Sequence, residues 1–164
     1  MAFIDSMNEF SDAQALTATA ISTNVYDLFS VRKGGSSTAS DISPNTRIDI
    51  GAGNNNDIWL VITVNTTFTT GTSATLIATL ETADDAGLTT NATVLATSGA
   101  ALGAASLTKG TQLIAVQIPA ALYRRYIGIR YTVGVGTFTA GAVDAYLTID
   151  PQINRPFKSA FTVQ

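Results

Sequence analysis

The side chains that most often carry out catalysis are missing from this sequence. It contains no histidine and no cysteine, so the commonest general base, the thiol nucleophile and two usual metal ligands are absent at once. Asp84 and Asp85 form the only adjacent acidic pair, and Ala86-Gly87 after them favours a turn. A solvated turn is therefore favoured over a calcium site, which needs more oxygen ligands. We expect no catalytic residue, no metal and no cofactor.

Three arginines lie close together in the sequence. Arg124 and Arg125 directly precede a predicted strand, and Arg130 lies on the polar face of that strand. Guanidinium groups bind carboxylates through paired hydrogen bonds, so the three are predicted assembly contacts that pair with carboxylates of a neighbouring subunit. A solvated sheet face is the alternative. The net charge is −3 and the nine Lys and Arg are spread along the chain, so nucleic-acid binding is not expected.

The elements that position these residues are predicted to be strands. The sequence holds 25 Thr and 24 Ala, and only 13% of its residues are charged, compared with about 25% in typical soluble domains. Thr is β-branched and suits a pleated, half-buried surface. Eight segments show the apolar runs or the alternation of strands: Ser22 to Phe29, Thr46 to Ile50, Asp57 to Asn65, Ala74 to Ala83, Asn91 to Thr97, Thr111 to Ile118, Tyr126 to Val133 and Ala142 to Asp150.

Eight apolar strand faces are buried most economically between two packed sheets. We therefore predict an all-β fold, a jelly-roll-like two-sheet sandwich with extended N- and C-terminal arms. Residues 57–65 are apolar on both faces and are expected at the centre of a sheet. The last two segments are predicted to form a hairpin across the glycine-rich loop Gly134 to Gly141.

The predicted sandwich is one domain over residues 20–150, with an N-terminal arm at 1–19 and a C-terminal tail at 151–164. Residues 1–10 contain two carboxylates and no apolar run, so neither a signal peptide nor a membrane span is expected there. Phe157 and Phe161 lie on a tail broken by prolines. We predict that they are assembly contacts, because aromatic side chains on a free tail need another surface. A disordered tail is the alternative.

Three regions of the chain carry a family resemblance. Phe10 to Ala20 with Ser22 to Val25, Leu80 to Asp85, and Tyr126 to Val133 with Phe138 to Thr148 resemble the opening, the central strand with its acidic turn, and the closing hairpin of one family. That family is the capsid cement, or decoration, proteins of short-tailed bacteriophages. The likeness spans residues 10–149. The loop Val31 to Pro44 and the segment after Asp150 depart from it.

The resemblance implies a jelly-roll-like structural virion protein without an active site. Such a protein sits on the outer face of an icosahedral shell, ties neighbouring major capsid subunits together and stabilises the head. The implied partners are the major capsid protein and further copies of the chain itself, as a dimer or a trimer. The implied location is the outer capsid surface of the virion, after synthesis in the host bacterial cytoplasm. No membrane partner is expected.

Two other classes of protein stay open. A carbohydrate-binding or adhesin β-sandwich of a phage tail fibre would display aromatic rings around a concave site. Trp59 is the candidate ring, although its position in an apolar run favours core packing. A β-sandwich enzyme that works through carboxylates would need two acidic residues facing each other across a cleft.

Overall fold

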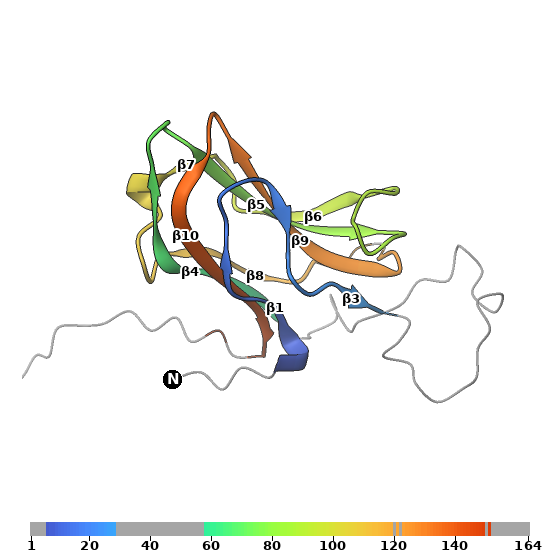
Figure 1. Cartoon of the computed structure of the whole chain (residues 1–164). Coiled ribbons are helices and arrows are strands. Elements are labelled where there is room, and N and C mark those ends of the chain that lie inside the picture. Colours follow the sequence, from blue (N-terminus) through green and yellow to red (C-terminus); the bar gives the residue numbers. More distant parts are fainter. Residues whose placement is uncertain (1–5, 29–57, 120, 122, 150, 152–164) are drawn as a thin grey trace, which may run out of the picture.

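The computed structural model describes residues 6–28, 58–119, 121, 123–149 and 151, and this part of the chain is built from strands (Figure 1). Within these ranges the helical elements are two short 3-10 helices, η1 (Ser6–Asn8) and η3 (Ala104–Ser106), and no helix is long and apolar enough to cross a membrane. The strands are β1 (Glu9–Ala15), β2 (Ala20–Ile21), β3 (Tyr26–Asp27), β4 (Trp59–Thr70), β5 (Thr75–Ala83), β6 (Thr93–Thr97), β7 (Leu102–Gly103), β8 (Gln112–Gln117), β9 (Tyr126–Gly134) and β10 (Phe138–Thr148).

The strands form two antiparallel sheets that pack against each other as a β-sandwich (Figure 1). The four-stranded sheet has the order β1-β10-β4-β8, and the six-stranded sheet has the order β2-β9-β5-β6. β3 pairs with β9 in line with β2, and β7 pairs with β5 in line with β6. When β2 is counted with β3, and β6 with β7, the two sheets have the strand order of a jelly roll. The predicted fold class is confirmed.

The core lies between the two sheets and takes alternate residues from the central strands, as the period of two for strand side chains requires. Leu60 on β4 and Ile129 on β9 are fully buried examples from opposite sheets. The hydroxyl of Tyr131 on β9 lies 2.9 Å from Ser11 Oγ on β1, a buried hydrogen bond that joins one sheet to the other. Burial raises the pKa of Tyr131.

The predicted N-terminal arm at residues 1–19 is wrong over much of its length. Residues 9–15 form β1, an edge strand of the four-stranded sheet that pairs with β10. Phe10 and Leu16 are 0% and 1% exposed, so they belong to the core. The β1–β10 register shifts twice, and Ala13 has a φ of 42°. These irregularities break the alternation by which a strand is recognised in a sequence.

The predicted hairpin of the last two strands is also wrong. β9 pairs with β5, β2 and β3, whereas β10 pairs with β4 and β1. The residues between Gly134 and Phe138 therefore carry the chain from one sheet to the other. Alternation shows that each segment has one buried face, but it does not show which strand lies beside it.

The predicted central strand at 57–65 is confirmed, because β4 lies between β10 and β8. The expected core position of Trp59 is wrong. Leu60 and Ile62 of β4 face the core, so Trp59 and Val61 face outward from the sheet. Trp59 is partly exposed, and Val61 is buried. The predicted strand Thr46 to Ile50 and the tail after residue 151 lie outside the described residues.

Candidate functional site

All three arginines predicted as assembly contacts have a carboxylate partner in their own chain. Arg124 and Arg125 lie just before β9 and Arg130 lies on β9, so the sequence grouping is preserved in space. These guanidinium groups form internal ion pairs, and their predicted contact with a neighbouring subunit stays a prediction. The pairs are Arg124 with Asp84 at 2.8 Å, Arg125 with Asp27 at 2.8 Å and Arg130 with Glu81 at 3.0 Å.

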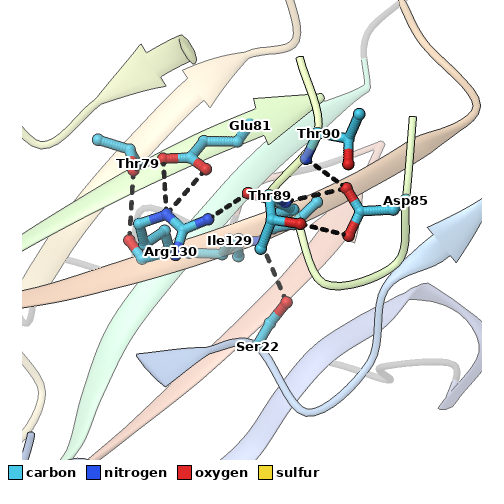
Figure 2. A network of polar contacts seen from close by, with 9 residues as sticks. Ser22, Thr79, Glu81, Asp85, Thr89, Thr90, Ile129 and Arg130 are labelled. Carbon is cyan, nitrogen blue, oxygen red and sulfur yellow. Dashed lines mark hydrogen bonds and ion pairs between the residues drawn. The ribbon is translucent and has the colours of Figure 1, made fainter. Parts of the chain in front are cut away.

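The Arg130–Glu81 pair is the most enclosed of the three. The side chain of Glu81 is 8% exposed and that of Arg130 is 28% exposed. Figure 2 shows Arg130 Nε between the two Glu81 oxygens, at 3.0 and 3.2 Å, while Thr79 Oγ1 donates a hydrogen bond to Glu81 Oε1. The guanidinium also donates to the carbonyl oxygen of Leu88. This pair joins β5, β9 and the β5–β6 loop on the outer face of the six-stranded sheet.

The acidic pair Asp84-Asp85 forms part of the β5–β6 loop, residues 84–92. Asp85 accepts three hydrogen bonds from Thr89 and Thr90, from both amides and from Thr89 Oγ1 (Figure 2). A fourth comes from the amide of Gly87. The described residues contain no group of three or more acidic side chains placed to hold a metal. The hydrogen bonds around Asp85 are those of a turn, as the sequence predicted.

Those hydrogen bonds favour the ionised form of the Asp85 carboxyl. The amide of Thr90 contributes most, and the pKa of Asp85 falls from its ordinary 3.8 to about 2. The pKa of Asp84 is lowered too, first by the side-chain amide of Asn91 and then by Arg124. Both carboxylates are therefore ionised at neutral pH and accept hydrogen bonds from residues of the loop.

The loop is held on the sheet by close packing at Gly128 of β9. Leu88 is 1% exposed, although its φ of 52° is unusual for a residue with a branched side chain. A Cβ atom at Gly128 would lie 2.9 Å from Leu88 Cδ1 and 3.1 Å from Val25 Cγ2. Gly128 thus makes room for the loop, and the outer face of this sheet is covered here by the chain itself.

The acid dependence of the loop tests the role of Asp85. Because its pKa is lower in the folded chain than in the unfolded chain, its contribution to stability is complete above about pH 4 and declines as the pH falls toward 2. We expect the amides of Thr89 and Thr90 to lose protection from hydrogen exchange across this window. Asp85→Asn should lower their protection at neutral pH and remove the change between pH 4 and 2.

Asp12→Asn is the matched control, since it makes the same carboxylate-to-amide change at an exposed residue of β1 outside the loop. It should leave the exchange of Thr89 and Thr90 as in the unchanged chain. Equal protection in the Asp85→Asn variant and the unchanged chain at neutral pH would show that the carboxylate does not organise the loop.

The other two arginine pairs are at the surface. The side chains of Arg124 and Asp84 are 39% and 41% exposed, and those of Arg125 and Asp27 are 46% and 23% exposed. Arg125 also lies over the ring of Tyr126, with its guanidinium carbon 4.9 Å from the ring centroid. Exposed pairs of this kind typically contribute about 0–1 kcal/mol each.

A different set of side chains lies on the outward face of the four-stranded sheet. Glu9 of β1 is opposite Tyr146 of β10, and Asp144 follows on the same face. The pKa of Glu9 is raised, first by burial and then by the charges of Asp12 and Asp144. The pKa of Tyr146 is raised by burial and by Asp144. This grouping was not predicted from the sequence, because the residues come from separated segments and share no motif.

The predicted contacts Phe157 and Phe161 lie outside the described residues. Within those residues, the polar contacts comprise internal ion pairs, a self-bonded acidic loop and buried side chains whose polar atoms all have partners. The class defined by the fold and these contacts is a jelly-roll β-sandwich with internally paired arginines.

The chain belongs to the Bbp16 family, whose model matches residues 10–147. The match begins inside β1 and ends inside β10, so it includes every strand of both sheets. No curated protein matches the chain.

Proposed function

We propose that this protein is a structural virion protein that binds the outer face of an icosahedral phage capsid and cements neighbouring major capsid subunits. The observation that carries the proposal is the position of the stretches that resemble capsid cement proteins. They coincide with β1, the end of β5 with its acidic turn, β9 and β10. These segments supply strands to both sheets and the loop that covers one of them, so the likeness involves both layers of the sandwich.

The composition supports a protein that works through extended contact. Thr and Ala lose little conformational entropy on burial, and an uncharged residue is cheaper to desolvate than Lys or Glu. Many exposed or half-exposed positions of β4, β5 and β6 are Thr. A protein that binds the assembled shell and not its free subunits stabilises the shell by mass action, and contact with two subunits at once increases the apparent affinity.

The proposed partners are the major capsid protein and further copies of the chain, as a dimer or a trimer. The proposed location is the outer capsid surface after synthesis in the host bacterial cytoplasm. Because the described arginines are already paired, we expect the shell contacts to rely mainly on other residues. The proposed role requires neither a catalytic step nor a cofactor.

Binding to shells tests the proposal. Shells of the virus that encodes this chain, prepared without the chain, should take up the purified protein to a fixed ratio per capsid subunit and should then withstand a higher temperature. Unassembled capsid protein, sedimented or chromatographed under the same conditions, should bind much less, because it lacks the seams between subunits. Shells that take up no protein would contradict the proposal.

A second function is favoured by one observation. Trp59 and Tyr146 both lie on the outward face of the four-stranded sheet, partly exposed and on adjacent strands. Aromatic rings on a sheet face can stack on sugars, as in a carbohydrate-binding or adhesin sandwich. Trp59 is the single tryptophan of the chain, so saccharide binding should change its fluorescence. Saturable changes with host glycans, removed by Trp59→Ala, would favour the adhesin.

A further inference from the structure

The outward face of the four-stranded sheet combines aromatic rings with carboxylates. Five residues define this acidic–aromatic face: Trp59, Tyr146, Glu9, Asp12 and Asp144. Trp59 and Tyr146 flank the buried Val61, because Val61 is the direct cross-strand partner of Tyr146 and Trp59 lies two residues before it. The rings therefore form one partly exposed apolar surface rather than two isolated side chains.

The carboxylates of this face have no cationic partner among the described residues. Every ion pair within these ranges involves Asp27, Glu81 or Asp84. Asp144 accepts hydrogen bonds from the amide of Ala13 at 2.7 Å and from Asn65 Nδ2 at 2.9 Å, which hold it in place without neutralising it. The acidic–aromatic face is thus complementary to a segment that carries both positive charge and large apolar side chains.

The end of this same chain has that composition. Residues 151–164 contain Arg155 and Lys158, no acidic side chain, and the two phenylalanines at 157 and 161. Ile149 and Asp150 separate this segment from the end of β10, the strand that carries Tyr146 and Asp144. Residues 151–164 are therefore complementary to the acidic–aromatic face in both charge and apolar character.

Chain stereochemistry favours a neighbouring copy as the place where the segment binds. A residue before proline avoids the helical region, and prolines stand at 151 and 156. At the spacing of an extended chain, about 3.1 Å per residue, position 157 can lie up to about 28 Å from the end of β10. A segment with that reach is long enough to contact another molecule.

We propose that residues 151–164 of one copy dock across the acidic–aromatic face of a neighbouring copy. Arg155 and Lys158 lie against the carboxylates, and Phe157 and Phe161 pack beside Trp59 and Tyr146. Exchange of such segments around a closed ring or a two-fold axis buries one face on every copy. The inference concerns how copies join and is tested without shells, so its failure and a failure of shell binding are separate results.

The test uses the full-length chain and two readouts, its molecular mass over a concentration series and the exposure of Trp59 to a fluorescence quencher. The unchanged protein should self-associate and protect Trp59 as it does so. Phe157→Ala with Phe161→Ala should weaken association at least about a hundredfold, since each buried Phe contributes tenfold or more. Arg155→Glu with Lys158→Glu should also weaken it, and Glu9→Lys with Asp12→Lys should restore association to that variant.

Lys33→Glu with Lys109→Glu is the matched control, because it makes the same change in net charge outside both the segment and the acidic–aromatic face. It should associate like the unchanged protein if the charges act at the acidic–aromatic face. Three results would overturn the proposal: a monomer at all concentrations, a loss of association that is equal in the control and the tail variants, or protection of Trp59 that depends on the segment but not on protein concentration. The last would show that the segment docks on its own copy.

Discussion

Arg130→Ala should destabilise the sandwich by about 2–4 kcal/mol, much more than alanine at either neighbouring arginine. Removing Arg130 leaves the Glu81 carboxylate, which is 8% exposed, without its cation, and an unpaired buried charge is strongly unfavourable. The expected loss of stability is smaller than for a fully buried ion pair because Arg130 itself is 28% exposed. Water can therefore enter in its place. The change also removes the hydrogen bond to Leu88. Chemical denaturation with both urea and guanidinium chloride measures the loss.

Arg124→Ala and Arg125→Ala are the comparison, since their pairs are exposed and should each change stability by less than about 1 kcal/mol. A double change, Glu81→Gln with Arg130→Met, should cost less than Arg130→Met alone, because it removes both charges together. Three arginine variants of equal stability would show that depth of burial does not rank these pairs.

Gly141→Ala is expected to lower stability by about 3 kcal/mol or more, through steric overlap in the core and an unfavourable backbone angle. Gly141 lies within β10 at a shift of register and has a φ of 144°. A Cβ atom there would lie 2.2 Å from Cδ1 of Phe68, which is 2% exposed. The Phe68 ring cannot withdraw freely, because it packs edge-on against Phe138 with centroids 4.8 Å apart.

Gly99→Ala separates the cost of the backbone angle from the cost of steric overlap in the core. Gly99 has a φ of 89°, and a Cβ atom added there would have no neighbouring atom within 4 Å, so alanine should cost only about 1–2 kcal/mol for the backbone angle. Gly71→Ala has neither problem and should stay within about 0.5 kcal/mol of the unchanged chain. The melting temperature should therefore fall most in Gly141→Ala, less in Gly99→Ala and least in Gly71→Ala. An equal fall in the Gly99 and Gly141 variants would exclude the overlap with Phe68 as the main cause.

The sequence predicted strands best where alternation is unbroken. Residues 74–83 were expected as a half-buried strand, and β5 covers Thr75–Ala83, because every second side chain enters one core. β1 escaped detection because bulges interrupt its alternation. The Gly134 to Gly141 segment was predicted as a loop, yet β10 begins at Phe138 and Gly141 lies at an irregular point inside the strand. A glycine within a strand marks such sites as readily as it marks a turn.

The candidate site was less predictable than the fold. The arginines were found, but their partners lie 40, 98 and 49 positions away, in the order Arg124, Arg125, Arg130. No local pattern encodes such pairs, because they form only when β3, β5 and β9 come together. The outward position of Trp59 was missed for a similar reason. An apolar run does not tell which of its two faces is the core, and only the neighbouring sheet decides that.

The central claim is that this sandwich cements a capsid, and a density map of the complete particle tests it most directly. We predict a discrete protrusion of the size of this sandwich on the outer shell surface, placed over the seams between major capsid subunits. The same protrusion should be absent from particles made without the chain. A sandwich found only at the tail, with bare seams on the shell, would contradict the claim and favour the adhesin.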